Sequence, residues 1–120
     1  MKSYTDLEQS KKLAKILPLE SADMKWYFWK SEIDAPKLPT FGYSKDAAEN
    51  YKSTEAVYLP CWSLAALLTI LPELQGGKPI IALDDNYITY PHISDLHTKA
   101  DSLIDACVTM IIKLSEHKML

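Results

Sequence analysis

The chain contains no arginine. All thirteen of its basic residues are lysines, and with sixteen Asp and Glu residues the net charge is −3. Arginine supplies the planar fork that recognises guanine edges and phosphates, so sequence-specific nucleic-acid binding is not expected. Glycine is scarce as well: only Gly42, Gly76 and Gly77 occur, and none precedes a recognisable phosphate-binding helix. These absences argue against ATP, GTP and nicotinamide, and no cofactor is predicted.

Long apolar runs are also missing. The longest, from Leu64 to Leu71 apart from Thr69, is far too short to span a bilayer. The first residues carry no apolar stretch of the kind found in signal peptides, so we expect no membrane association and a cytoplasmic location. The two cysteines, Cys61 and Cys107, match no metal-ligand spacing and are expected to be free, buried thiols in a reducing compartment.

Length and composition indicate one folded domain over residues 1–120. The chain is 48% hydrophobic and 24% charged, which is close to the average of folded proteins and far from that of disordered chains. At 120 residues it is long enough to bury a core without disulfides or metals.

Three segments have the pattern of helices. Thr5 and Glu8 form a capping box that predicts a helix over residues 6–17, ended by Pro18. The apolar segment between Pro60 and Pro72 predicts the central, buried helix. Ser102 and Asp105 form a second capping box before a helix that ends near His117; its apolar stripe comprises Leu103, Cys107, Met110, Ile111 and Leu114.

Strand patterns are found in two places. Residues 24–30 alternate with a period of two, which puts Met24, Trp26 and Phe28 on one face and Tyr27 and Trp29 on the other. Residues 80–83 and 87–90 flank Asp84-Asp85-Asn86 and predict a β-hairpin.

The segment from Ser31 to Tyr58 has little periodicity. Pro36, Pro39 and Gly42 interrupt it, and only residues 44–52 are typical of a short capped helix. The predicted fold is α+β: a small antiparallel sheet of three or more strands with three main helices packed on it, in the order α-β-(α)-α-β-β-α.

Several segments resemble a family of small uncharacterised proteins from gut-type anaerobic bacteria and their mobile elements. The similar segments are Glu8–Leu13, Leu17–Met24, Pro60–Pro72, Asp105–Cys107, Met110–Ile111 and Lys113–Leu114. The resemblance implies a bacterial origin and a shared fold, and it carries no activity that could be assigned to this chain.

One hypothesis for function is a small hydrolase. The spacing His92-x-x-Asp95-x-His97, beside Asp84 and Asp85, is compatible with a divalent metal such as zinc or manganese, although the turn alone explains the two aspartates.

A cysteine hydrolase is the second form of this hypothesis. It would use Cys61, at the start of the predicted central helix, with His92 or His97 as its base. Glu20 and Asp23 form a further candidate acid/base pair, or they stabilise the junction between the first helix and the first strand.

The leading hypothesis is a non-enzymatic protein that binds a protein partner or itself as a homodimer. Twelve aromatic residues in 120 are more than a small core is expected to absorb. The contact candidates are Tyr27, Trp29, Phe41 and Tyr43, with Tyr87 and Tyr90 as further ones. A third alternative is a small-ligand pocket between the central helix and the sheet.

Overall fold

A computed structural model describes residues 2–32, 34–35, 37–93 and 95–120, and within these ranges the chain forms four α-helices and six strands. The helices are α1 (Leu7–Ala14), α2 (Lys45–Tyr51), α3 (Leu64–Ile70) and α4 (Leu103–Glu116). The strands are β1 (Met24–Trp29), β2 (Thr40–Phe41), β3 (Ala56–Cys61), β4 (Ile80–Ala82), β5 (Tyr87–Thr89) and β6 (His97–Lys99). Pro36, which was expected to interrupt the chain, lies outside the described residues.

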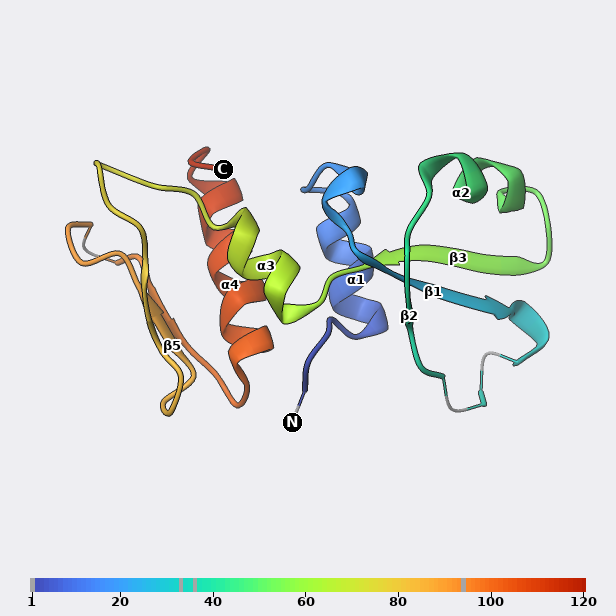
Figure 1. Ribbon diagram of the computed structural model, residues 1–120, viewed down its shortest axis with the longest axis horizontal. Helices are drawn as coiled ribbons and strands as arrows, with labels where there is room; N and C mark the ends of the chain where they lie inside the picture. The colour runs from blue at the N-terminus through green and yellow to red at the C-terminus, as the bar shows by residue number, and fades with distance from the viewer. Residues whose placement is uncertain (1, 33, 36, 94) are drawn as a thin grey trace.

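The strands form two antiparallel sheets, ordered β2-β1-β3 and β4-β5-β6. Figure 1 shows them at opposite ends of an elongated molecule, with α1, α3 and α4 between them. The molecule measures 47 × 27 × 20 Å, and its radius of gyration of 15.3 Å exceeds the roughly 14 Å typical of a spherical domain of this length. The α+β class is confirmed. The strands divide into two sheets instead of one because helices separate the two groups.

The helix α1 and its cap each begin one residue later than predicted. Asp6, not Thr5, is the N-cap: its carboxylate accepts the Gln9 N–H, and the Gln9 side chain accepts the Asp6 N–H. Thr5 is fully buried: its hydroxyl bonds to Ser10 and accepts the Trp62 backbone N–H, and its own backbone N–H donates to the Trp62 carbonyl. The helix ends at Ala14, well before Pro18, and the chain continues in turns.

The helix predicted between Pro60 and Pro72 is shorter and less buried than expected. Pro60 and Cys61 belong to β3, and α3 starts only after the N-cap Ser63, whose hydroxyl accepts the Ala66 N–H. Within α3 only Leu67 is buried. The prediction of a central buried helix is therefore wrong for this segment. The helix α3 is apolar on all sides, but it packs beside α4 and most of its residues are partly exposed.

The central buried helix is α4. Ser102 caps it as predicted by accepting the Asp105 N–H at 3.1 Å, but the Asp105 carboxylate accepts from Lys2 and Gln9 and does not complete the predicted capping box. Eight of its fourteen residues are buried, including the whole predicted stripe. They form the larger core cluster together with residues of α1, α3 and β5. In the part of the chain that the structure describes, no helix is long and apolar enough to cross a membrane.

The first strand and the hairpin are confirmed. In β1, Met24, Trp26 and Phe28 are buried in a second, smaller core cluster with Cys61, while Tyr27 and Trp29 are exposed. The hairpin pairs Ile80 with Thr89 across the turn, and β6 extends this sheet by pairing with β5.

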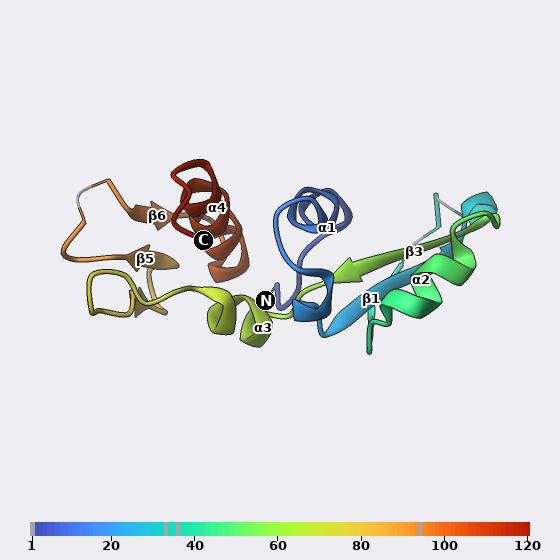
Figure 2. The same ribbon diagram turned by 90° about the horizontal axis from the view of Figure 1, so that it is seen from above.

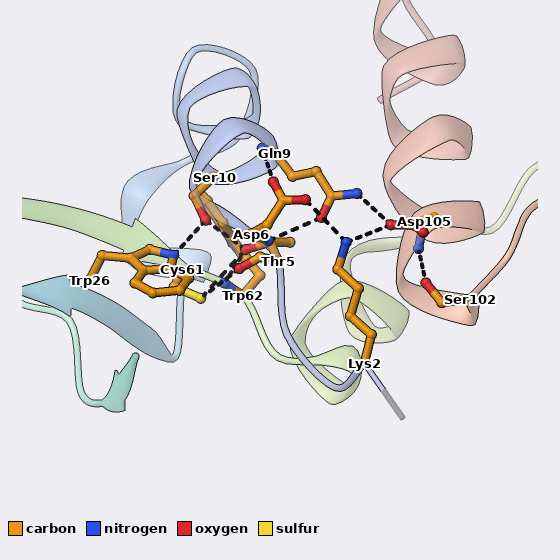
Figure 3. A network of polar contacts seen from close by, with 10 residues as sticks. All are labelled: Lys2, Thr5, Asp6, Gln9, Ser10, Trp26, Cys61, Trp62, Ser102 and Asp105. Carbon is orange, nitrogen blue, oxygen red and sulfur yellow. Dashed lines mark hydrogen bonds and ion pairs between the residues drawn. The ribbon is translucent and has the colours of Figure 1, made fainter. Parts of the chain in front are cut away.

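The amino-terminal segment joins the two halves through a network of polar contacts (Figure 3). Toward the small cluster, Ser10 Oγ lies 2.8 Å from Thr5 Oγ1 and accepts the Trp26 indole N–H at 3.1 Å. Toward α4, the Asp105 carboxylate accepts from Lys2 Nζ at 2.7 Å and from Gln9 Nε2 at 2.6 Å. Residues 2–10 therefore connect the β2-β1-β3 sheet to the helical half.

Candidate functional site

Aromatic side chains gather on the outer face of the β2-β1-β3 sheet, the face turned away from α1. Figure 2 shows α1 on one side of β1 and β3 and α2 on the other. Since alternate residues of a strand point to opposite faces, burial of Trp26 and Phe28 against α1 leaves Tyr27 and Trp29 outside. Tyr27 is 40% exposed and Trp29 is 48% exposed.

Five residues form this group, which we call the outer aromatic surface: Tyr27, Trp29, Tyr43, Tyr51 and Tyr58. The centroid of the Tyr27 ring lies 5.0 Å from that of Tyr51, 5.9 Å from that of Tyr58 and 6.4 Å from that of Trp29. Tyr51 and Tyr58 stack at 5.6 Å, and Tyr43 lies 5.5 Å from Tyr58. These distances are those of directly contacting rings. The surface is therefore one continuous patch built from β1, β3, α2 and the segment before α2.

Polar contacts hold the rings of this patch in place. The backbone N–H of Ser44, the N-cap of α2, donates to the Tyr58 hydroxyl at 3.1 Å and so ties α2 to β3. Lys25 Nζ lies 6.0 Å from the centroid of the Tyr58 ring, at the limit of a cation–π contact. Burial, and then the charges of Tyr58 and Glu49, raise the pKa of Tyr43.

The four contact candidates from the sequence do not all lie on this surface. Tyr27, Trp29 and Tyr43 belong to it. Phe41 pairs with Met24, and directly opposed residues share a face, so Phe41 is on the opposite side of the sheet; it is 75% exposed there. Of the two further candidates, Tyr90 is buried and donates its hydroxyl to the Pro72 carbonyl at 2.6 Å, while Tyr87 is half-buried beside His97.

Two members of the patch, Tyr51 and Tyr58, were not identified from the sequence. Tyr58 went unrecognised because β3 falls at the end of the segment without clear periodicity and continues into residues assigned to a helix. The alternation of Val57, Tyr58 and Leu59 within a β-favouring stretch was the available signal. Tyr51 is the last residue of α2, a helix that the capping pattern did predict.

The residues of the hydrolase hypothesis are dispersed. His97 lies in β6, His92 and Asp95 lie in the turns before it, and all three are exposed. Across the described ranges, no three His, Cys, Asp or Glu side chains come together as a metal site. The Asp95 carbonyl accepts from Lys113 Nζ at 3.4 Å, so α4 anchors this loop. The metal-dependent form of the hypothesis has no geometric support.

Cys61 is not at a helix start, and its surroundings disfavour a thiolate. It is fully buried at the end of β3, where its thiol donates to the Thr5 carbonyl at 3.4 Å and the Thr5 hydroxyl lies 3.5 Å away. Burial, opposed by these hydrogen bonds, raises the pKa of Cys61. The predicted position of Cys61 at the start of the central helix is therefore wrong. Cys61 and His97 also belong to different sheets.

Glu20 and Asp23 have separate environments. Glu20 is exposed in a short 3-10 turn over Leu19–Ser21. The Asp23 carboxylate accepts the Ser63 backbone N–H at 2.9 Å and also the Ser63 hydroxyl, and Ser63 in turn caps α3. Asp23 therefore stabilises the chain where β1 and α3 begin, and it does not form an acid/base pair with Glu20.

A hollow of about 410 Å³ lies between α3, the hairpin and the start of α4. Its lining includes Leu64, Leu83 and Leu103 together with Lys2. Lys2 is engaged by the carboxylates of Asp105 at 2.7 Å and Asp6 at 3.2 Å, so its charge is already neutralised. The hollow therefore presents mainly apolar surface and no free cation among its described lining residues.

No protein-family model, curated protein or solved structure matches the chain.

Proposed function

We propose that this chain is a non-enzymatic interaction protein that binds a protein partner through the outer aromatic surface. The observation that supports it is the exposure of Tyr27 and Trp29 within a group of five contacting aromatic rings. Tyr and Trp are the residue types enriched at the energetic centres of protein interfaces, because they bury large areas and lose little conformational entropy. A second copy of the chain is the alternative partner.

Rigid positioning supports the same proposal. Four of the rings come from two paired strands and a helix, Tyr43 lies in the segment before the helix, and the Ser44–Tyr58 hydrogen bond fixes the helix on the strands. A surface that is ordered before binding loses less entropy when a partner docks. The resemblance to proteins of bacterial mobile elements extends the proposal to an accessory role in the cytoplasm of such a bacterium, and that extension rests on the resemblance alone.

The test compares capture of binding proteins by the immobilised wild type, by Trp29→Ala and by Leu83→Ala. Leu83 is a matched control because it is 68% exposed but lies on the hairpin of the other sheet. We expect Trp29→Ala to lose the captured protein and Leu83→Ala to retain it. Sedimentation equilibrium of the same three proteins separates self-association from binding of another protein. Capture that is equal for wild type and Trp29→Ala contradicts the proposal.

A further inference from the structure

The strand β3 has one edge that faces away from β1. The Lys30 N–H donates to the Glu55 carbonyl at 2.7 Å. In an antiparallel pair, the backbone N–H and C=O groups of alternate residues point to the same neighbour, so those of residues 55, 57, 59 and 61 point toward β1. Ala56, Tyr58 and Pro60 therefore direct their backbone groups to the opposite edge. Two observations agree with this assignment. The Ala56 N–H donates to Thr54 Oγ1 at 3.2 Å and not to β1, and Pro60, which has no N–H, stands at a position that donates no hydrogen bond to β1.

Part of this edge is closed by the amino-terminal segment. The Thr5 N–H donates to the Trp62 carbonyl and the Leu64 N–H donates to the Ser3 carbonyl, both at 3.0 Å. Nothing comparable covers Tyr58. Among the described residues, its backbone N–H and C=O, which point away from β1, have no hydrogen-bond partner. Such groups need either water or an added strand.

A groove of about 250 Å³ runs beside this edge. Its floor includes residues 56–59, and its other wall comes from Ala48 and Tyr51 of α2 and from Lys52, the residue that follows the helix. Because alternate side chains of a strand point to opposite faces, a groove lined by four consecutive strand residues lies along the strand's edge. Figure 1 shows α2 next to β3 on the side away from β1. An extended chain in this groove meets the backbone of Tyr58 and two rings of the outer aromatic surface.

The charged side chains that line the groove are both lysines. Lys30 and Lys52 belong to the lining, both are exposed, and the described lining contains no acidic side chain. Glu49 lies 3.6 Å from Lys52, but both side chains of this pair are mostly exposed, so water screens it and Lys52 keeps much of its field. The groove is therefore complementary to carboxylates.

We propose that an extended, acidic segment of the partner protein adds to β3 as a further strand, with its backbone on Tyr58 and its carboxylates near Lys30 and Lys52. The inference rests on the proposed function and specifies the chemistry of the partner. A second copy fits less well. Pairing two β3 edges brings four lysines together, and each copy contributes a single N–H, because Pro60 has none and that of Ala56 is bound to Thr54.

The experiment uses a soluble ten-residue peptide that alternates Glu and Val, with a Lys–Val peptide as its counterpart. Binding is followed by fluorescence anisotropy, and amide hydrogen exchange is followed by NMR on the full chain. We expect the Tyr58 amide to exchange rapidly in the free protein and to become protected by the Glu–Val peptide, while the Leu59 amide is protected throughout. We expect the Lys–Val peptide to bind at least about tenfold more weakly.

The charge contribution is tested by the double variant Lys30→Glu/Lys52→Glu, with the exposed Lys78→Glu as control. We expect the double variant to bind the Glu–Val peptide about tenfold or more weakly than the wild type, and the control to change this affinity less than about twofold. Absence of binding, equal affinity for both peptides, or binding without protection of the Tyr58 amide overturns edge pairing. Protection that grows with protein concentration alone assigns the edge to a second copy instead. In all of these cases the Trp29→Ala capture test still decides the proposed function separately.

Discussion

Replacing Asp105 by Asn removes one charge from the junction between the two halves of the molecule. Its carboxylate accepts from Lys2 at 2.7 Å and from Gln9 at 2.6 Å, and the Lys2 and Asp105 side chains are 29% and 31% exposed. Exposed ion pairs contribute up to about 1 kcal/mol, and hydrogen bonds to charged groups contribute about 1.5–3 kcal/mol. Asn retains an acceptor for Gln9, so we expect a loss of about 1 kcal/mol, which corresponds to a fall in Tm of about 4 °C.

The effect depends on pH in a defined direction. Burial alone would raise the pKa of Asp105, but hydrogen bonds from Lys2 and Gln9 and the Lys2 charge outweigh burial and lower it. A carboxyl with a lowered folded-state pKa stabilises the fold above its unfolded pKa of about 4, and this contribution disappears as the pH falls through the lowered value. The difference in Tm between wild type and Asp105→Asn is therefore full at pH 7 and disappears once the pH is below the lowered pKa of Asp105.

Thermal unfolding followed by circular dichroism at several pH values measures this difference. Glu8→Gln is the matched control, because Glu8 pairs with Lys11 at 3.8 Å with side chains that are 79% and 55% exposed. We expect the control to change the free energy of unfolding by less than about 0.5 kcal/mol. An equal loss of Tm in both variants, or a loss in Asp105→Asn that persists at low pH, refutes the assignment of this pair as a connection between the halves.

Two further predictions concern the cores and the thiols. Cys61 and Cys107 are both free and fully buried, and burial raises the pKa of Cys107 to about 12. The thiols of the native protein should therefore react with iodoacetamide at least about a hundredfold more slowly than those of the protein in denaturant. Equal rates would show that the thiols are accessible. Trp62 is fully buried and donates its indole N–H to Ser21 Oγ at 3.0 Å, whereas Trp29 is half-exposed. In urea unfolding, Trp62→Ala should lower the free energy of unfolding by about 3–5 kcal/mol and Trp29→Ala by about 1 kcal/mol or less. Similar costs at both positions would mean that Trp29 belongs to the core.

The elements with strong local periodicity were predictable from the sequence. The alternation in β1 correctly separated Trp26 and Phe28 from Tyr27 and Trp29, and the stripe on α4 identified its buried face. Both patterns result from burial of one face, so the periodicity of the sequence follows that of the structure. The free, buried state of both cysteines was also correctly predicted.

Errors arose where tertiary contacts override local pattern. Pro60 and Cys61 were assigned to a helix, yet they extend β3 because β1 pairs with them across the sheet. Thr5 is a good helix cap by type, but the buried bond to Ser10 takes its hydroxyl and leaves the cap to Asp6. The outer aromatic surface was only partly predictable: Tyr27, Trp29 and Tyr43 were identified, but the short β-favouring stretch around Tyr58 was too weak a signal to show that Tyr58 pairs opposite Tyr27.

The central claim is that a partner docks on the outer aromatic surface, and photo-crosslinking in the cells that make the protein tests it most directly. A benzoylphenylalanine placed at Trp29 reports contacts at this surface, and one placed at Leu83 reports contacts at an exposed site on the hairpin of the other sheet. We predict a discrete crosslinked protein from position 29 that is absent from position 83 and is lost when Tyr27 is also changed to Ala. A crosslink from position 83 alone, or one from position 29 that survives Tyr27→Ala unchanged, would contradict the claim.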